Sequence, residues 1–520
     1  MATPHLSSAA RTSRRLLTRK PVTSLTASGL DTQKCTVLGQ RMASTVTKNE
    51  RKKERVVILG SGWSGYGLAR SLDPNKYERI MISPRSYFVF TPLLAGTAVG
   101  TLEFRAVLEP VRRLGLDYFH QGWADDIDFA RKTIRVEANT SDDLASRTRL
   151  ALKRSADGGT VKGPTFDVEY DKLILAVGSY SATFGIEGVR EHANFLRDVG
   201  DARRIRMKVL QSFEKAALPV TTDEEREKLL HFAIVGGGPT GIEFAAELHD
   251  LIRDDLTKTY PELLKFINIT VYDVAPKVLP MFDKTLADYA MERFHREGIK
   301  VKTEHHLTRI RPDEECEGCF KLKITECGDK EVNAGIVVWS TGLMQNPLVQ
   351  KLANKTFKLS SSDAEVKLQK DAKTGGIMID DHLRVHVVPR DAVSDSAPSQ
   401  TRDATLLPDV YGVGDCTVIS GLRLPATAQV ASQQAAHLAK RLNKGDVGQK
   451  PFQFKNLGTM TYLGSWTAIH QSSIDEMKGW MAWVLWRTAY LTRSMSIRNK
   501  ITVPFYWAIS WIFGRDISRF

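Results

Sequence analysis

Two segments of the chain repeat the same order of apolar, glycine-rich and helical residues. The first is the apolar run 56–59, followed by GSGWSG at 60–65 and a helical stretch at 66–72. The second is the apolar run 232–235, followed by GGGPTG at 236–241 and a helical stretch at 242–248. A short apolar run before glycines is typical of a buried strand, and helical spacing follows it both times. The pattern predicts two strand–turn–helix units.

Each glycine turn is suited to the pyrophosphate of a dinucleotide. In G-x-G-x-x-G the first glycine permits a tight turn, the second lets the backbone approach the phosphates, and the third lets helix and strand pack closely. The N-terminus of the helix then faces the negative charge of the phosphates. The glycines expected to do this are Gly60, Gly62 and Gly65 in the first unit and Gly236, Gly238 and Gly241 in the second.

A carboxylate at the end of the next strand usually holds the ribose 2′-hydroxyl. In the second unit this residue is Asp273, at the end of the run 269–273, and its charge would disfavour the 2′-phosphate of NADPH. It lies 32 residues after Gly241 because the charged stretch 250–260 lengthens the helical segment. In the first unit the strand 79–83 ends without an acid, so Ser83 and Arg85 are the candidates there.

Three further strand–turn patterns follow the glycine turns. Residues 170–178 form a strand that ends in an Ala176–Gly178 turn, residues 337–342 end in the same way at Gly342, and residues 410–415 end in Gly-Asp at Asp415. With these motifs the chain resembles the flavoproteins with two dinucleotide-binding domains, from about residue 55 to residue 440. The resemblance implies that FAD binds the first turn, that Asp415 bonds to its ribityl hydroxyls, and that NADH binds the second.

The cysteines separate the classes within that superfamily. Disulfide reductases carry a redox pair shortly after the first glycine turn, and residues 60–120 contain no cysteine. Sulfide:quinone oxidoreductases need paired cysteines beside the flavin, whereas only Cys416 adjoins Asp415. Cys316 and Cys319 form a CxxC between two alternating segments, which predicts a β-hairpin with both cysteines incidental to its loop. No second ligand pair accompanies them, so no metal site is expected.

Longer stretches are similar to the type II NADH:ubiquinone oxidoreductases, the alternative NADH dehydrogenases of mitochondria. They are SPRSYFVFTPLL at 83–94, TFGIEGV at 183–189, LPATAQVA at 424–431 and FQFKNLGTMTYLGS at 452–465. The resemblance implies hydride transfer from NADH to FAD and two-electron reduction of ubiquinone without proton pumping. It also implies that Thr91 contacts a cofactor, that Glu243 lies near nicotinamide and flavin, and that Gln429 lies near the quinone. A fungal relative has a histidine three residues beyond this Gln. The corresponding residue here is Ser432, and Gln433 follows it.

The net charge of +13 is concentrated at the two ends of the chain. Residues 1–55 carry twelve Lys and Arg against three acids, residues 476–520 carry seven against two, and the 420 residues between them sum to −1. A nearly neutral middle does not favour a nucleic-acid partner. Residues 1–30 contain ten Ser and Thr and no acid, which is typical of a mitochondrial presequence. A disordered basic tail is the alternative.

The C-terminal segment is rich in tryptophan. Five of the nine tryptophans lie in or next to the apolar runs 480–491 and 501–513. Each run is shorter than the roughly 20 residues that span a bilayer. Basic, Trp-rich helices of this length are typical of a membrane interface, where a lipid-soluble quinone could be collected. A dimer interface or core packing is the alternative, and both functions could coexist.

We therefore expect an α/β fold with two Rossmann-like domains and a C-terminal membrane-anchoring helical region. The expected segments are a presequence 1–45, an FAD domain 52–227 and 346–440, an inserted NADH domain 228–345, and the anchor 441–520. The expected partners are ubiquinone, a bilayer surface and a second copy of the chain, and the expected location is the matrix side of the mitochondrial inner membrane. The alternatives are a sulfide:quinone oxidoreductase and a redox signalling protein like apoptosis-inducing factor.

Overall fold

The first glycine turn follows a strand in the middle of a twelve-stranded sheet. The computed structural model describes residues 53–139, 163–359, 362–391 and 405–519, so the expected presequence lies outside the described residues. Strand β1 (Glu54–Leu59) pairs in parallel with β2 (Tyr77–Ser83) and β8 (Lys172–Leu175). Its residues Val56–Leu59 are buried, as the continuous apolar run predicts for a strand that is covered on both faces.

The remaining strands of this sheet extend it on both sides. On one side β2 pairs with β5 (Tyr118–Asp128), and β6 (Thr133–Ala138) and β7 (Thr165–Glu169) follow. On the other side lie β23 (Thr405–Gly412), β22 (Arg384–Pro389), β20 (Ser362–Leu368) and β19 (Thr356–Leu359), with β21 (Ile377–Ile379) and β24 (Thr417–Ile419) attached. The FAD part expected at 346–440 thus returns to the sheet that the first part began.

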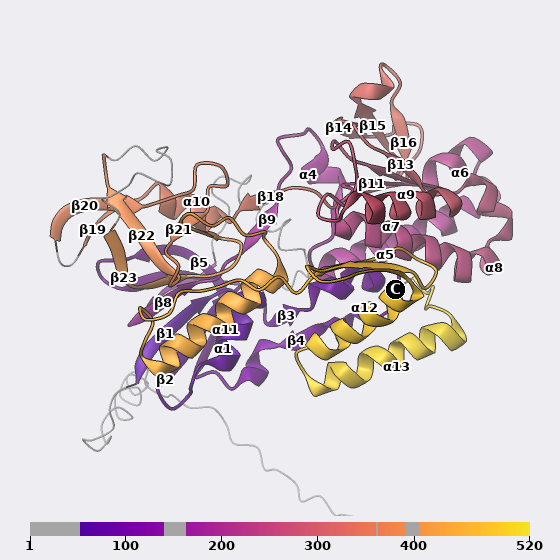
Figure 1. Ribbon diagram of the computed structural model, residues 1–520. Coiled ribbons are helices and arrows are strands. Elements are labelled where there is room, and N and C mark those ends of the chain that lie inside the picture. The colour runs from indigo at the N-terminus through magenta and orange to yellow at the C-terminus, as the bar shows by residue number, and fades with distance from the viewer. Residues whose placement is uncertain (1–52, 140–162, 360–361, 392–404, 520) are drawn as a thin grey trace, which may run out of the picture. The chain divides into compact units, whose positions relative to one another are not determined.

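Two helices lie side by side against this sheet (Figure 1). Helix α1 (Trp63–Ser71) begins directly after the first glycine turn, and α11 (Ala428–Lys444) comes from the distant second part of the FAD domain. They approach closely at Gly67, where an added Cβ would lie 3.7 Å from the Cβ of Ala435.

The second glycine turn belongs to a separate five-stranded parallel sheet in the order β10-β17-β11-β12-β13. Its strands are β11 (His231–Val235), β12 (Asn268–Tyr272), β13 (Lys300–Lys302), β17 (Ile336–Trp339) and β10 (Asn194–Phe195). Helices α5 (Val199–Ala216), α7 (Pro239–Leu251) and α9 (Lys284–Arg296) accompany it. Strand β10 lies before residue 228, where the NADH domain was expected to begin, yet it pairs with β17.

The helical stretch after the second glycine turn is longer than in the first unit. Helix α7 passes through a π-helical turn, Ile252–Leu256, into α8 (Thr257–Thr259) before the chain reaches β12. This continuation accounts for the long spacing between Gly241 and Asp273. A π-turn inserts one residue into the helical hydrogen-bond ladder and commonly marks a functional region.

The hairpin predicted around the CxxC is confirmed. Strand β14 (Leu307–Pro312) pairs antiparallel with β15 (Phe320–Ile324), and β16 (Val332–Ala334) completes a small sheet. The interpretation of the cysteines as incidental was wrong, because Cys316 and Cys319 are buried and joined by a disulfide. Two cysteines three residues apart in one turn are close enough to pair, and both are hidden from solvent.

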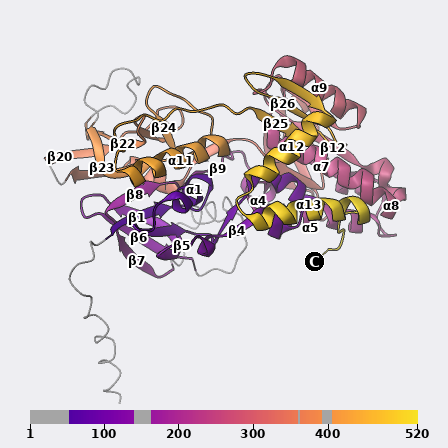
Figure 2. The ribbon, with the colours of Figure 1, turned by 60° about the horizontal axis from the view of Figure 1, so that its bottom comes forward.

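The C-terminal region forms a small sheet and two helices beside the NADH domain (Figures 1 and 2). The sheet contains β25 (Thr459–Tyr462), β26 (Ala468–Gln471) and β27 (Glu476–Gly479), and the helices are α12 (Trp480–Arg493) and α13 (Ile497–Phe513). The guanidinium carbon of Arg487 lies 4.4 Å from the ring centre of Trp483 and 4.3 Å from that of Trp507, which ties α12 to α13. Within the described part of the chain, no helix combines the length and apolarity that crossing a bilayer requires.

Short elements connect these units. They are β3 (Tyr87–Val89), β4 (Leu108–Pro110), β9 (Ser179–Ser181), β18 (Leu343–Gln345), α2 (Leu94–Ala98), α4 (Val189–His192), α6 (Asp223–Leu229) and α10 (Pro347–Ala353). Strands β9 and β18 pair antiparallel where the chain enters and leaves the NADH domain. This two-stranded ribbon therefore connects the two dinucleotide-binding units.

Candidate functional site

The two glycine turns have the same backbone geometry. Gly60 and Gly236 have φ values of +109° and +116°, which side-chain-bearing residues rarely adopt. A Cβ on Gly65 would lie 1.9 Å from the carbonyl oxygen of Gly60, and a Cβ on Gly241 would lie 1.9 Å from that of Gly236. The third glycine of each motif is therefore required for the helix to reach the turn.

The second glycine of each motif faces open space. A Cβ on Gly62 or Gly238 would meet no atom within 4 Å, and each residue caps the N-terminus of the following helix, α1 or α7. The first N–H groups of a helix have no partner within it and carry a partial positive charge. Each turn thus offers an uncrowded cradle of donors, which fits the pyrophosphate of FAD at the first turn and of NADH at the second.

Most of the expected site residues line one cavity of about 470 Å³. Its walls include residues of both glycine-turn helices, of the Ala176–Gly178 and Gly342 turns, and of the C-terminal helix α12. The expected residues among them are Gly60, Gly62, Ser83, Arg85, Thr91, Ala176, Gly178, Glu243, Gly342 and Asp415. The first residues of α7, Pro239 and Thr240, also line it, so the second unit opens on the same space as the first.

Asp415 is held at one end of this cavity. It follows β23, and its Oδ2 accepts a hydrogen bond of 2.9 Å from the hydroxyl of Ser179. The guanidinium of Arg197 lies 3.8 Å from the same oxygen and keeps the carboxylate in a charged environment. Asp415 is thus fixed at the carboxyl ends of parallel strands, where open α/β sheets bind ligands. A carboxylate oriented in this way can accept hydrogen bonds from the hydroxyls of a bound sugar alcohol.

Ser83 and Arg85 form part of the wall after β2. The Ser83 hydroxyl lies 2.8 Å from that of Ser61, within the glycine turn itself. The Arg85 guanidinium forms an ion pair of 2.5 Å with Asp198, the N-cap of α5, and so is already neutralised. Thr91 accepts a hydrogen bond of 3.0 Å from the indole of Trp63. None of these three wall residues is acidic, and the carboxylate among their partners, that of Asp198, is paired with Arg85.

Asp273 lies directly after β12, against the second glycine turn. Its Oδ2 accepts a hydrogen bond from the backbone N–H of Gly237, and its Oδ1 accepts one of 2.7 Å from Ala275. The carboxylate is therefore next to the turn although it is remote in sequence. It does not line the 470 Å³ cavity, whereas Glu243 does.

Glu243 is the buried acid of the cavity. It lies on α7, just after the first turn of the helix, and is 9% exposed, and its Oε1 accepts a hydrogen bond of 3.3 Å from the backbone N–H of Tyr462. Burial raises the pKa of Glu243 to about 8. The side chain is therefore mostly protonated at neutral pH and can hold a proton beside the cavity.

Gln429 does not line the cavity. Its amide nitrogen donates to the carbonyl of Gly458 at 3.3 Å, and its oxygen accepts from the N–H of Leu457 at 3.0 Å. One turn along α11, Gln433 makes the same pair of bonds with the backbone of Lys455, both 2.9 Å. The two amides therefore fasten the segment 455–458 to α11, while the residues just before Gln429, Ala426–Ala428, reach the cavity.

Among the cavity residues that sequence reasoning missed are two side chains from the C-terminal region. Tyr490 of α12 and Met460 of β25 both line it, and Tyr490 packs against Phe90 with ring centres 6.2 Å apart. Burial raises the pKa of the Tyr490 hydroxyl well above its ordinary value. The aromatic composition of residues 480–491 was a signal, but it pointed equally to a membrane surface.

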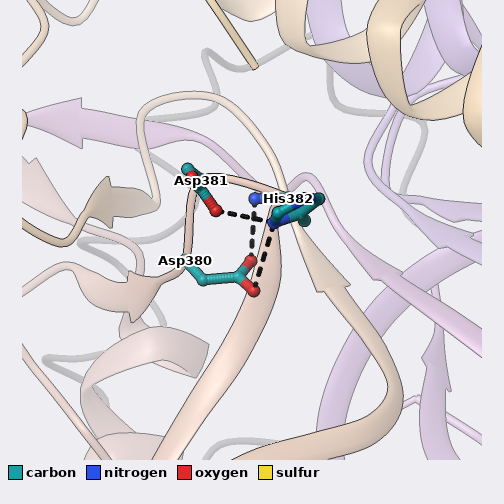
Figure 3. A group of neighbouring side chains, drawn as sticks. All are labelled: Asp380, Asp381 and His382. Atoms are coloured by element: carbon teal, nitrogen blue, oxygen red, sulfur yellow. Dashed lines mark hydrogen bonds and ion pairs between the residues drawn. The ribbon is translucent and has the colours of Figure 1, made fainter. Parts of the chain in front are cut away.

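One group of metal-type ligands lies outside this site, in the turn before β22 (Figure 3). The Nδ1 of His382 is 2.6 Å from Asp381 and 3.9 Å from Asp380. Asp380 also accepts hydrogen bonds of 2.7 Å and 2.8 Å from the side chain and backbone of Arg384. Because Arg384 is paired with Asp380 and the ring of His382 already contacts both carboxylates, the cluster is explained as a set of contacts that stabilise the turn.

Comparison with known proteins agrees with this arrangement. Residues 54–435 match the pyridine nucleotide-disulphide oxidoreductase family, and residues 456–516 match the NDH2 C-terminal domain. The chain is 37% identical over 474 residues to a probable NADH dehydrogenase of Dictyostelium discoideum, covering 90% of this chain and 92% of the relative. It is 35% identical to the mitochondrial internal alternative NAD(P)H-ubiquinone oxidoreductase A1 of Solanum tuberosum, covering 91% and 89%.

A solved structure shows the same fold. NDH2 of Plasmodium falciparum in complex with NADH superposes with a TM-score of 0.73 at 24% identity, covering 90% of this chain and all of that one. The expected α/β architecture with a C-terminal helical region is confirmed. The chain belongs to the pyridine nucleotide-disulphide oxidoreductases and, among them, to the type II NADH dehydrogenases, the alternative NAD(P)H-ubiquinone oxidoreductases.

Proposed function

We propose that this chain is a mitochondrial NADH:ubiquinone oxidoreductase that binds FAD at the first glycine turn and NADH at the second. The observation that carries the proposal is the shared cavity, which receives the N-terminal ends of both α1 and α7. Two dinucleotides bound at these turns would direct their reactive rings to the same space. Bound FAD would supply the redox chemistry, by accepting a hydride from the nicotinamide and giving two electrons to a quinone.

The protein's own residues bind and orient the two dinucleotides and exclude water from the cavity between them. The first turn, Ser179 and Asp415 hold the FAD end, and the second turn with Asp273 holds the NADH end. The preference for NADH over NADPH follows from Asp273, whose carboxylate would repel a 2′-phosphate. Tyr490 and Met460 close the cavity on the side of the C-terminal region and separate it from solvent.

Glu243 is suited to hold a proton at this site. Reduction of ubiquinone to ubiquinol takes up two electrons and two protons. The hydride from NADH accounts for both electrons and one of these protons, and the second proton comes from solvent. A carboxyl group that is buried beside the cavity, with a pKa of about 8, is protonated before turnover and can donate at neutral pH. We assign Glu243 to the quinone and nicotinamide end of the cavity. Gln429 acts from outside it, by holding segment 455–458.

The two C-terminal helices are the proposed contact with the bilayer. Exposed apolar residues recur along α13 at a spacing of four, at Ile497, Ile501 and Phe505, and they are 78%, 66% and 60% exposed. On α12 Trp480 is 69% exposed and Val484 is 42% exposed. Large exposed apolar patches mark membrane or protein contacts, and Trp-rich helices favour the membrane interface. This location brings the cavity wall at Tyr490 close to where a lipid-soluble quinone resides.

We further propose that the protein faces the matrix and forms a homodimer. The matrix assignment rests on the basic, acid-free start of the chain and on the similarity to the potato protein named as internal. Protease treatment of mitoplasts tests it, since a matrix enzyme survives until the inner membrane is opened. The homodimer uses part of the exposed apolar surface of α12 and α13, and the particle mass in an uncharged detergent tests it.

The alternative acceptors are less well supported. A sulfide:quinone oxidoreductase needs two cysteines at the flavin, but Cys416 is buried and the disulfide-bonded pair lies in the β14–β15 turn. Burial also raises the pKa of the Cys416 thiol to about 11, which suppresses its reactive thiolate form. A redox signalling protein would keep its flavin reduced for long periods instead of passing electrons on.

The deciding experiment is steady-state NADH oxidation by the purified flavoprotein in lipid, with and without a soluble ubiquinone analogue. Rapid oxidation that depends on the quinone is the expected result. Flavin that NADH reduces but quinone does not reoxidise would exclude ubiquinone as acceptor and favour the signalling alternative. Sulfide as donor in the same assay tests the other alternative.

A further inference from the structure

A second and larger cavity, of about 1150 Å³, lies between the helical segment 247–259 and the C-terminal helices α12 and α13. It is separate from the dinucleotide cavity, and no residue lines both. One wall is charged and comes from the NADH domain. The other wall is aromatic and comes from Trp466, Trp483, Trp507 and Trp511. A large space with one charged and one aromatic wall fits an amphiphile better than a small polar metabolite.

Most of the charges in this cavity already have partners. Arg515 is 2.8 Å from Asp255 and 3.4 Å from Asp254, and Arg253 is 2.8 Å from Asp254. Asp250 accepts a hydrogen bond of 2.6 Å from the hydroxyl of Tyr462. These pairs are satisfied within the protein and therefore do not require a ligand.

Arg487 is the exception. Its guanidinium carbon lies over the rings of both Trp483 and Trp507, and among the described residues no carboxylate comes within ion-pair distance of it. Its Nε is buried without a hydrogen-bond partner. Burial lowers the pKa of Arg487, and the carboxylate of Glu247, which also lines the cavity, opposes this shift from beyond ion-pair distance. A largely desolvated guanidinium without an ion pair is energetically costly unless a ligand supplies an anion at closer range.

A second cation stands at the edge of the same cavity. Lys258 of α8 is exposed and forms no ion pair within the described part of the chain. The cavity also reaches the end of α13, where Trp511, Ile512 and Phe513 are 71%, 62% and 81% exposed. Two unpaired cations and a strongly exposed apolar end thus border one space.

We infer that this cavity binds the headgroup of an anionic phospholipid, with its phosphate on Arg487 and its acyl chains along the exposed end of α13. The guanidinium presents a planar fork of donors that matches phosphate oxygens, and the flanking indoles keep this fork in place. Lys258 supplies a second positive charge at the entrance. The inference rests on the proposed contact of α12 and α13 with the bilayer, because the acyl chains would remain continuous with that surface.

Free phosphate has the same chemistry at Arg487 but makes no use of the apolar end. The lipid is favoured because Trp511, Ile512 and Phe513 form one border of the cavity and are otherwise left in water. Burying apolar surface adds to the binding energy only for a ligand that carries hydrocarbon. The two sources of the phosphate group can therefore be told apart by their relative affinities.

The test is native mass spectrometry of the full-length, FAD-loaded protein, released from an uncharged detergent. Dioleoyl phosphatidate and dioleoyl phosphatidylcholine are titrated separately, and inorganic phosphate is added as a competitor. The expected result is one tightly bound phosphatidate, with an affinity about tenfold above that of phosphatidylcholine, since a charge-assisted contact is involved. Equal affinities for the two lipids, or displacement of phosphatidate by an equal concentration of inorganic phosphate, would overturn the inference.

Variants locate the site. Arg487→Gln should abolish the preference for phosphatidate, and Lys258→Gln should reduce it. Arg487→Lys should retain much of it because the charge remains. Arg493→Gln is the matched control, because Arg493 is an exposed arginine on the same helix and does not line the cavity. An unchanged preference in Arg487→Gln would refute the assignment. If that variant does not fold, the outcome is decided by Lys258→Gln, whose side chain is at the surface.

Flotation with neutral vesicles separates this inference from the proposed membrane contact. Wild type that does not float would show that α12 and α13 do not bind a bilayer, so the contact on which the inference rests would fail. Wild type that floats but shows no preference for phosphatidate would leave the membrane contact intact and overturn the lipid site alone.

Discussion

The second glycine turn allows stability and ligand binding to be separated by two substitutions three residues apart. In Gly241→Ala the new Cβ would lie 1.9 Å from the carbonyl oxygen of Gly236 and 2.6 Å from the hydroxyl of Ser340. In Gly238→Ala it would meet no atom within 4 Å, and the backbone is extended, with φ of −75° and ψ of 177°. The first substitution should damage the fold, and the second should leave the fold intact but obstruct the bound phosphates.

The two effects differ in magnitude as well as kind. Backbone carbonyls cannot move aside as a flexible side chain does, so Gly241→Ala should lower the free energy of unfolding by about 1–3 kcal/mol or more. Gly238→Ala should be neutral, or stabilising by about 0.4–1 kcal/mol through the unfolded chain. The added methyl group of Gly238→Ala would, however, keep the phosphate of NADH from approaching the helix N-terminus closely. A lost charge-assisted hydrogen bond of about 1.5–3 kcal/mol raises the KM for NADH about ten- to hundredfold.

The measurements are thermal unfolding without NADH and the KM for NADH at saturating quinone. The first glycine turn provides a parallel pair, because Gly65→Ala clashes with the carbonyl oxygen of Gly60 at 1.9 Å and Gly62→Ala meets open space. There the readout is the flavin content of the purified protein, and Gly62→Ala should lose flavin. The reasoning is refuted if Gly238→Ala binds NADH as wild type does, or if it unfolds as readily as Gly241→Ala.

Three further predictions follow from the same structure. Because burial raises the folded pKa of Glu243 to about 8, above its unfolded value, wild type should lose stability relative to Glu243→Gln as pH rises from about 4.5 to 8. Unfolding by urea across that range tests this, and a constant difference would contradict it. Asp273→Asn should raise kcat/KM for NADPH about tenfold or more while keeping an acceptor for Gly237, and an unchanged NADPH rate would exclude Asp273 as the discriminating residue. Phe505→Asp should reduce flotation with lipid vesicles about tenfold, whereas Val220→Asp, at an apolar position that is even more exposed but distant from α13 in sequence, should not.

The sequence was sufficient to place the two glycine turns, because their requirements are local. A tight turn, a close helix–strand contact and a following strand are all encoded within about 35 residues, and Asp273 could be located although the helix before it is unusually long. The strands that complete the FAD sheet were also recognisable, since Ala176–Gly178 and Gly414–Asp415 each terminate an apolar run.

Features that depend on distant parts of the chain were not predictable in the same way. The side chain of Gln429 was expected near a quinone, but its amide bonds to the backbone of Leu457 and Gly458, a choice that depends on how the following loop folds back. Tyr490 was assigned only to an aromatic helix, because nothing in its local pattern shows that α12 packs over the cavity. The pairing of β10 with β17 likewise joins residues about 140 positions apart.

The position of Tyr490 changes what the C-terminal helices are. Because a residue of α12 forms a wall of the 470 Å³ cavity, and because the backbone N–H of Tyr462 in β25 bonds to Glu243, the region that we propose to contact lipid also encloses part of the proposed redox site. Truncation before residue 480 would therefore not yield a water-soluble form of the intact enzyme. It would leave a flavoprotein with an opened cavity, in which dioxygen could oxidise the reduced flavin and divert electrons from the respiratory chain.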